Sequence, residues 1–161
     1  MTYARDMAVL TTPIGSVRIE GSADVVHAVR ILNEREAPHR ADGPAVLAAA
    51  AQLEAWFEGA LRQFDLALAP PATPRGLALR QGLIDVRYGD TVTYGVLAAR
   101  LGSASRAIGQ LCARNPFPIV VPCHRVLSSG GAPERYSAGD GPRTKSWLLD
   151  HERLHSGKTL L

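Results

Sequence analysis

A proline-rich segment in the middle of the chain constrains the fold more than any other sequence feature. Three prolines fall within residues 69–75 (APPATPR) of a chain of 161 residues. Proline fixes φ and has no N–H to donate, so a helix or a central strand does not continue through such a segment. We therefore predict two subdomains, residues 1–74 and residues 75–161.

The sign of the charge changes at the same place. Residues 1–74 hold six Arg against nine Asp and Glu, whereas residues 75–161 hold twelve Arg and Lys against six acidic residues. A basic second half favours an anionic partner. The chain has no run of 18 apolar residues, and its first residues lack the apolar core of a signal peptide. We therefore expect a cytoplasmic protein with no membrane contact.

The first half predicts a small β-sheet with one helix. Alternating apolar residues predict a hairpin that turns at residues 13–16 and a further strand over 25–32. A helix is expected to start at Pro44 and to end at Gly59, and a last strand is expected over 63–68. The stripe of this helix that faces the sheet is expected to consist of Val46, Ala50, Leu53 and Phe57.

The second half predicts a helix-turn-helix after a first helix over 76–86. Thr93 is expected to cap a short helix that Gly102 ends. Ser103 is expected to cap the next helix, over 104–114. Two short helices joined by a Gly-Ser turn are typical of DNA-binding proteins, although most such pairs only pack. The buried face of the second helix is expected to hold Ile108, Leu111 and Cys112, with Cys112 in a packing role.

Residues 115–126 (NPFPIVVPCHRV) carry the strongest chemical signal. Asn-Pro-Phe-Pro predicts a rigid turn, and residues 119–121 predict a short buried strand that a proline ends. Cys123 then follows this strand directly, beside His124 and Arg125. A cysteine in such a basic setting is one whose thiolate is stabilised, so Cys123 is the candidate nucleophile.

The partners of Cys123 follow from chain geometry. Adjacent residues of an extended chain point to opposite sides, so His124 is expected to reach Cys123 through a water molecule or a backbone twist. A carboxylate would orient the imidazole, and Glu152 is the first candidate, with Asp150 second. The chain has two cysteines and five histidines, and none of them cluster with zinc spacing, so we expect no metal site.

In these residues the chain resembles the O6-alkylguanine-DNA alkyltransferases, the methylated-DNA–protein-cysteine methyltransferases. The PCHRV string is the most specific part of the match. The other matching segments lie in order along residues 88–152 and are Val92-Thr93-Tyr94, residues 105–109, Tyr136-Ser137-Ala138-Gly139, residues 145–149 and His151-Glu152. The resemblance implies an α/β (α+β) fold. It implies a small N-terminal ribonuclease-H-like β-sheet subdomain and a C-terminal, mainly helical, winged-helix-like DNA-binding subdomain with a helix-turn-helix.

The resemblance also implies a role for each catalytic residue. Cys123 would accept the alkyl group, His124 would deprotonate Cys123 through water, and Glu152 would hold His124. Asn115 would support the turn and the backbone of Cys123. Tyr94 would press on the phosphate of the target nucleotide and protonate the leaving guanine.

Further residues are implied to contact DNA or the flipped base. Arg106 would enter the duplex and take the place of the flipped nucleotide. The other expected DNA contacts are Tyr94, Ala104, Ser105, Gly109, Gln110 and Arg125. The guanine pocket is expected to be lined by Pro118, Val126, Tyr136 and Ser137. Ala138 stands where the family has a second glycine, and a positive φ at this position would strain it.

The implied activity is DNA repair by a single, irreversible transfer of an alkyl group from O6-alkylguanine in duplex DNA to Cys123. It needs no cofactor, because the thiol itself is consumed. The partner would be double-stranded DNA, bound in the minor groove with little sequence preference and strong salt dependence. We expect a monomer, in the cytoplasm of a bacterial-type cell and on the nucleoid when bound.

Three alternatives use the same residues. A non-enzymatic damage binder of the alkyltransferase-like kind would have another residue in place of Cys123, often Trp. A DNA-binding regulator would use Cys123 as a sensor, and would need an operator sequence and a dimer. A thiol protease needs a direct Cys–His pair, which adjacent residues such as Cys123 and His124 do not provide.

Overall fold

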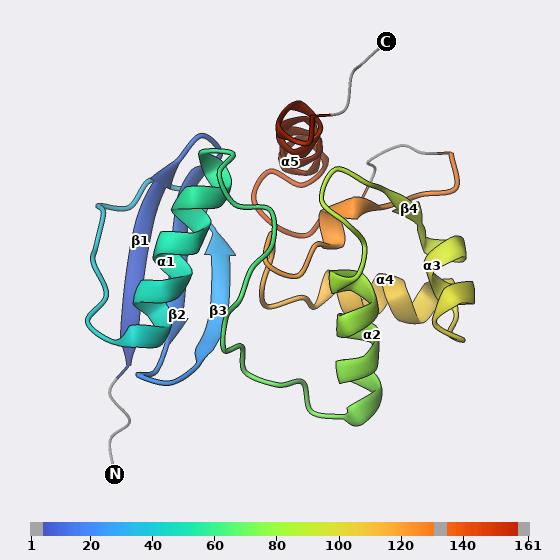
Figure 1. Ribbon diagram of the computed structural model, residues 1–161, viewed down its shortest axis with the longest axis horizontal. Coiled ribbons are helices and arrows are strands. Elements are labelled where there is room, and N and C mark those ends of the chain that lie inside the picture. The colour runs from blue at the N-terminus through green and yellow to red at the C-terminus, as the bar shows by residue number, and fades with distance from the viewer. Residues whose placement is uncertain (1–4, 131–134, 158–161) are drawn as a thin grey trace. The chain divides into compact units, whose positions relative to one another are not determined.

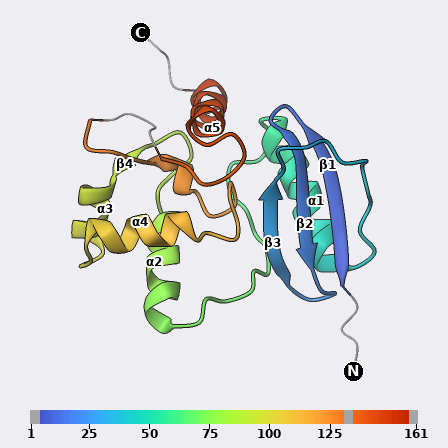
Figure 2. The same ribbon diagram turned by 180° about the vertical axis from the view of Figure 1, so that it is seen from behind.

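A computed structural model describes residues 5–130 and 135–157 (Figures 1 and 2). The chain divides into two compact units, one ending at Ala69 and the other beginning at Pro70. This division lies inside the proline-rich segment, while a functional boundary between residues 74 and 75 stays a prediction. In the described part of the chain, no helix is both long enough and apolar enough to span a membrane.

The first unit contains an antiparallel sheet of three strands, β1 (Asp6–Thr12), β2 (Gly15–Gly21) and β3 (Val26–Ile31), in that order. Thr12 pairs with Gly15, so the expected hairpin closes through two residues. Gly15 has φ 107°, and a Cβ there would lie 3.3 Å from the carbonyl oxygen of Leu32. This turn therefore needs glycine, which confirms the hairpin that the sequence predicts.

Helix α1 (Pro44–Phe57) covers one face of this sheet, in front of it in Figure 1 and behind it in Figure 2. The predicted stripe is only half right. Val46 and Leu53 are buried, but Ala50 and Phe57 are half-buried, and the other buried positions are Ala49 and Trp56. Both the predicted and the observed set of residues fit a period of 3.6 residues. The sheet packs against the set that contains Trp56, whose indole is larger than the ring of Phe57.

Residues 63–68 do not form the predicted strand. Only Leu68 is bridged to the sheet, in parallel with Val26 of β3. Val26 donates to the carbonyl oxygen of Ala67 at 2.8 Å and accepts from the N–H of Ala69 at 2.8 Å. Pro70 and Pro71 follow, and neither has an N–H to extend the ladder, so the pairing ends after one residue.

The second unit is mainly helical. Its elements are α2 (Pro74–Ile84), β4 (Val92–Thr93), α3 (Tyr94–Arg100), α4 (Ser105–Ala113), the 3-10 turn η1 (Cys123–Arg125), β5 (Val126–Leu127) and α5 (Pro142–His155). Strands β4 and β5 are parallel, with Val92 opposite Val126. Because β4 leads directly into α3 and β5 follows η1, this pairing brings the start of α3 close to Cys123.

Helices α3 and α4 form the predicted helix pair. The side chain of Thr93 accepts a hydrogen bond from the N–H of Val96 at 3.2 Å, which confirms Thr93 as the N-cap. The prediction that Ser103 caps α4 is wrong, because the residue with extended backbone before this helix is Ala104, which offers no side-chain acceptor. Of the three residues expected on the buried face, Ile108 is fully buried, while Leu111 and Cys112 are half-buried.

Candidate active site

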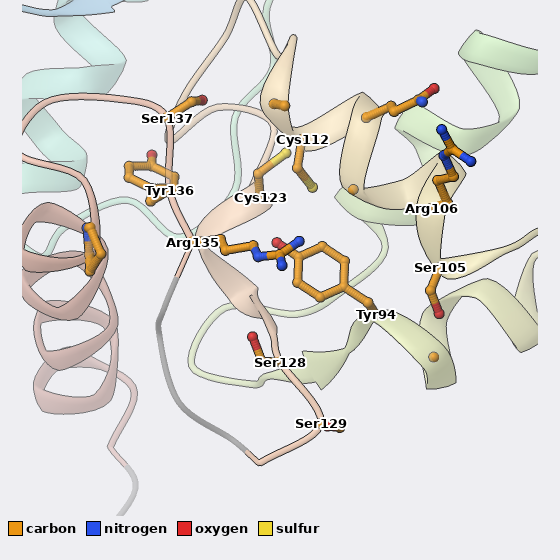
Figure 3. Close-up of a pocket in the computed structure, with 15 residues that line it drawn as sticks. Tyr94, Ser105, Arg106, Cys112, Cys123, Ser128, Ser129, Arg135, Tyr136 and Ser137 are labelled. Carbon is orange, nitrogen blue, oxygen red and sulfur yellow. The ribbon is translucent and has the colours of Figure 1, made fainter.

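A pocket of about 920 Å³ opens in the second unit, between the start of α3, helix α4, η1 and the segments before α5 (Figure 3). Two arginines, Arg106 and Arg135, line it, and none of the lining residues that the structure describes is acidic. The pocket therefore suits an anionic ligand. The remaining lining residues are Tyr94, Gly95, Ser105, Gly109, Gln110, Cys112, Ala113, Cys123, Ser128, Ser129, Tyr136, Ser137 and Pro142.

Cys123 lies at the inner end of this pocket and is 3% exposed. The side-chain amide of Asn115 donates to the Cys123 sulfur at 3.4 Å and to the carbonyl oxygen of Val121 at 3.0 Å. Its Oδ1 accepts from the N–H of Phe117 at 2.9 Å. One amide therefore holds both ends of the turn and touches the sulfur.

The segment before Cys123 is a buried turn and not the predicted strand. The N–H of Val121 donates to the carbonyl oxygen of Phe117 at 2.9 Å. The N–H of Cys123 donates to the carbonyl oxygen of Val121 at 2.8 Å. The prolines of this segment cannot donate to a ladder, so its polar groups are satisfied within the turn instead. Ile119 has φ 75°, a costly conformation for a β-branched residue, which its burial in the core helps to maintain.

Directly behind Cys123, three charged or titratable side chains form a buried cluster. His124 Nε2 lies 2.8 Å from Glu152 Oε2, and both side chains are at most 1% exposed. Arg125 donates to the two carboxylate oxygens of Glu152 at 2.9 and 2.7 Å, and to the carbonyl oxygen of Val86 at 2.6 Å. Asp150, the second candidate, is 72% exposed and pairs with Arg153. The structure therefore brings Glu152, not Asp150, to His124.

Burial and hydrogen bonding set the charges of this cluster. Burial raises the pKa of Glu152, but the charges and hydrogen bonds of His124 and Arg125 outweigh it and lower that pKa to about 2. Burial lowers the pKa of His124 more than Glu152 raises it. His124 is therefore neutral near pH 7, and Arg125 is the permanent positive partner of Glu152. A neutral imidazole held by a carboxylate is suited to act as a base.

Cys123 itself is held as a thiol. A hydrogen bond to Cys112, together with burial, raises the pKa of Cys123 well above its ordinary value. Asn115 and Lys145 lower that pKa, but by less. The sequence-based expectation of a stabilised thiolate therefore does not describe the free protein. A proton has to be removed from Cys123 before it can act as a nucleophile.

Tyr94 and Lys145 form a pair at the wall of the pocket. The ammonium of Lys145 lies 5.8 Å from the centre of the Tyr94 ring and donates to the carbonyl oxygens of Val126 at 2.5 Å and Arg135 at 2.9 Å. Burial and the two cysteines raise the pKa of Tyr94 to about 12. Its hydroxyl therefore keeps its proton near neutral pH, and Lys145 ties together two segments that border the pocket.

The structure brings together eleven of the fifteen predicted site residues. Tyr94, Ser105, Arg106, Gly109, Gln110, Cys123, Tyr136 and Ser137 line the pocket, and Asn115, His124 and Glu152 lie behind it. Pro118, Val126 and Ala104 are not among the lining residues. Arg125 is 5% exposed and bonded to Glu152, so its place is inside the cluster and not at the surface where DNA contact was expected.

Sequence reasoning missed several residues at the pocket. Cys112, Arg135, Ser128 and Ser129 line it, and Lys145 braces it. The signal for Cys112 was its helical spacing of three residues from Gly109, which puts both on one face of α4. Among residues 5–130 and 135–157, no three His, Cys, Asp or Glu side chains cluster as a metal site would require.

The loop that carries Tyr136 and Ser137 avoids the strain expected at Ala138. Within the described residues, Ile119 is the only residue other than glycine with positive φ, so Ala138 does not need that conformation. Gly139 and Gly141 have φ 56° and 64° and make the sharp turns instead. The hydroxyl of Tyr136 is buried and has no hydrogen-bond partner in the described part of the chain.

Comparisons with known proteins agree with this arrangement. Residues 78–154 match the family model described as "6-O-methylguanine DNA methyltransferase, DNA binding domain". A methylated-DNA–protein-cysteine methyltransferase of Methanosarcina acetivorans is 34% identical, over 82% of this chain and 89% of that protein. The solved structure of the Mycobacterium tuberculosis O6-methylguanine methyltransferase is 30% identical, covers 98% of both chains and has a TM-score of 0.80.

A second structure of the Mycobacterium tuberculosis protein, solved in complex with DNA, is 32% identical to this chain. It covers 92% of this chain and 93% of its own, with a TM-score of 0.79. The mixed α and β architecture, with a small antiparallel sheet and a helical C-terminal unit, is the one that these relatives share. From this likeness across nearly its whole length, the chain belongs to the methylated-DNA–protein-cysteine methyltransferase family.

Proposed function

We propose that this protein repairs O6-alkylguanine in duplex DNA by transferring the alkyl group to its own Cys123. The observation that carries the proposal is the position of Cys123. Its sulfur lies in a pocket whose described lining residues include no acid, and it lies 3.4 Å from the amide of Asn115. The next residue, His124, is paired with Glu152 of α5. Such an arrangement supplies a nucleophile, a base and a group that orients the base.

The transfer is a substitution at the alkyl carbon. The Cys123 sulfur forms the new S–C bond with its electron pair while the C–O6 bond of guanine breaks. Glu152 occupies Nε2 of His124, so the proton of Cys123 has to reach the ring at Nδ1, through water. The protonated hydroxyl of Tyr94 serves as the donor for the leaving guanine oxygen.

One molecule acts once. The product is a thioether, a stable C–S bond that no group in the pocket is equipped to cleave. The net change moves the thiol proton to guanine and the alkyl group to sulfur, with no electrons gained or lost. The reaction therefore runs without a cofactor, and the protein is consumed in equal amount with the lesion.

Helix α4 is the proposed DNA-contacting element. Ser105, Arg106 and Gln110 are exposed on it, and a Cβ at Gly109 would meet nothing within 4 Å. This open, small-residue face with one long cation fits a narrow minor groove, with Arg106 filling the space of the flipped nucleotide. The buried hydroxyl of Tyr136 would form a hydrogen bond with the flipped base.

The decisive test is a single-turnover reaction with a duplex that contains one O6-methylguanine. Trypsin releases residues 115–125 as one peptide, and mass spectrometry should find one added methyl group on its cysteine. Cys123→Ser should show no transfer, with an unchanged circular dichroism spectrum. Tight binding of the duplex without methyl transfer would overturn the proposal and identify a damage binder instead.

Base flipping has a separate test. Arg106→Ala should slow the reaction with the duplex by about 10- to 100-fold, but leave the reaction with a free alkylated guanine base nearly unchanged. Arg114→Ala is the matched control, because Arg114 is an exposed arginine at the end of α4 that does not line the pocket. Equal effects of Arg106→Ala on both substrates would remove its role in the duplex.

A further inference from the structure

Two sulfur atoms share the pocket, and the proposed reaction uses one of them. Cys112 lies near the end of α4, Cys123 begins η1, and both line the pocket. Figure 3 shows the sulfur atoms of Cys112 and Cys123 next to each other, and the proximity of Cys112 raises the pKa of the Cys123 thiol. Cys112 is only half-buried, whereas Cys123 is buried. The sequence assigns Cys112 to packing, which does not explain why its thiol meets the acceptor.

The groups around the two cysteines place both sulfurs in the same part of the pocket. Electrostatic influence falls with distance, and Tyr94, Tyr136 and Lys145 are each affected by Cys112 and by Cys123. These three side chains come from α3, from the loop before α5 and from α5. Three different segments therefore border both sulfurs, which agrees with their shared position in the pocket.

We propose that Cys112 and Cys123 form a redox pair, which peroxides convert into a reversible intramolecular disulfide. The inference rests on the proposed function only for its consequence, because the bond forms whether or not Cys123 accepts alkyl groups. The chain has no other cysteine to compete for either sulfur. A disulfide forms only between cysteines whose side chains face each other at short range, and the two sulfurs lie next to each other in one pocket.

The chemistry balances with a peroxide as the oxidant. The proton of Cys123 first passes through water to His124, as in the proposed repair reaction. The Cys123 thiolate then attacks a peroxide oxygen, an S–O bond forms, the O–O bond breaks, and hydroxide leaves with the electron pair. The second thiolate then attacks that sulfur, the S–S bond forms, the S–O bond breaks, and a second hydroxide leaves. With the two thiol protons, hydrogen peroxide becomes two molecules of water. A dithiol reverses the change by exchange.

The disulfide would have two consequences for the acceptor. Cys123 would lose its nucleophile, so repair would stop while the oxidant is present. The same bond would protect Cys123 from the sulfinic and sulfonic acids, which thiols do not reduce. The half-buried Cys112 therefore acts as a resolving cysteine, one that traps the first oxidation product before a second peroxide reaches it.

The test begins with the reduced full-length protein and hydrogen peroxide. Trypsin cuts after Arg106, Arg114 and Arg125, so the two cysteines fall on separate peptides, residues 107–114 and 115–125. Without reductant, the oxidised protein should yield these two peptides joined, with the loss of two hydrogens. The joined pair should disappear after dithiothreitol. On a non-reducing gel the oxidised protein should still run as a single chain.

Cys112→Ser supplies the matched control. Each protein is compared with its own untreated sample for methyl transfer after peroxide and then dithiothreitol. Wild type should lose transfer and regain it fully with dithiothreitol, whereas Cys112→Ser should lose it without recovery and carry a sulfinic acid at Cys123. Cys112→Ala serves as a second variant, and circular dichroism checks that each one is folded.

The outcomes that would overturn the pair are distinct. They are a sulfinic acid on Cys123 of wild type with no joined peptide, a disulfide between two chains, or equal recovery in Cys112→Ser. Failure of the proposed function looks different. In that case the reduced wild type would accept no methyl group, while the joined peptide would still form.

Discussion

The two units of this molecule bury different kinds of side chain. In the described part of the first unit, aliphatic side chains and Trp56 make up the interior, and Ser16 is the one buried residue of the polar or charged class. The second unit also has an apolar core, but it buries a further set of polar and charged residues, namely Arg80, His124, Arg125, Thr144, Lys145, His151 and Glu152. The apolar interior of the first unit stabilises its fold by removing hydrocarbon surface from water. The interior of the second unit includes polar and charged groups, whose burial costs free energy unless each has a hydrogen-bond partner.

This difference separates stability from chemistry. A buried ion pair adds little stability compared with apolar residues of the same size, yet removal of one partner is strongly destabilising. Glu152 is held by His124 and Arg125, and Lys145 by two carbonyl oxygens. The interior of the second unit is therefore sensitive to the loss of any one charged partner, and this buried cluster lies next to Cys123. Local rules are most often broken at functional sites, where the break serves the chemistry.

The largest effect is expected from Glu152→Gln in the second unit. This change leaves the buried Arg125 without its charged partner, so the free energy of unfolding should fall by about 3–5 kcal/mol. Single-turnover methyl transfer should slow as well, because His124 loses the group that orients it. Asp150→Asn is the control on the same helix, and its exposed pair with Arg153 predicts a loss of about 0–1 kcal/mol.

Tryptophan fluorescence measures each unit separately, because Trp56 lies in the first and Trp147 in the second. A Trp56→Phe background reports unfolding of the second unit through Trp147, and a Trp147→Phe background reports the first through Trp56. Equal losses for Glu152→Gln and Asp150→Asn would contradict the buried network.

The next effect is a truncation in the first unit, Leu53→Ala. Leu53 is fully buried on α1, so the cavity should lower the free energy of unfolding of this unit by about 2–5 kcal/mol. Under conditions where the variant stays folded, the rate of methyl transfer should not change. Urea unfolding in the Trp147→Phe background measures the first quantity. A slowed transfer step in the folded variant would show that the first unit takes part in the chemistry.

Acid should weaken the second unit through Glu152. Its pKa is lowered in the folded protein, from an ordinary 4.5 to about 2, so the unfolded chain binds the proton more tightly. The stabilisation is complete above about pH 4.5 and is lost as the pH falls towards 2, a change of about 3 kcal/mol. Urea titrations of wild type and Glu152→Gln across this range measure it. The pH dependence should be smaller in the variant, and identical curves would reject the assignment.

The smallest effect is expected at a surface feature of the second unit, the N-cap of α3. Thr93→Ala removes the side-chain acceptor for the N–H of Val96 and should cost about 1 kcal/mol. Ala104→Ser, at the position before α4 that lacks such an acceptor, should add a similar amount. Thermal unfolding measures both. A loss at Thr93 as large as that of Glu152→Gln would show that the two kinds of interaction are not separable in this unit.

Local chemistry explains which expectations succeeded. The hairpin at Gly15, the cap at Thr93 and the helix end at Gly102 each depend on the backbone needs of one or two residues. The errors occurred where neighbours decide. Trp56 replaced Phe57 in the core because of where the sheet lies. Residues 119–121 became a turn because the flanking prolines cannot donate to a ladder and the N–H of Val121 bonds within the segment, to Phe117.

The sequence by itself determined which residues we propose to react. The proline-rich segment indicated two units, and PCHRV with a downstream His151-Glu152 indicated a cysteine acceptor with its base and carboxylate. Only the tertiary structure decided which carboxylate meets His124, that Arg125 turns inward, and that Cys112 lies against Cys123. Backbone preferences act over a few residues and can be read along the chain. Contacts between α4, η1 and α5 form only when the chain packs, because burial brings together residues that the sequence keeps apart.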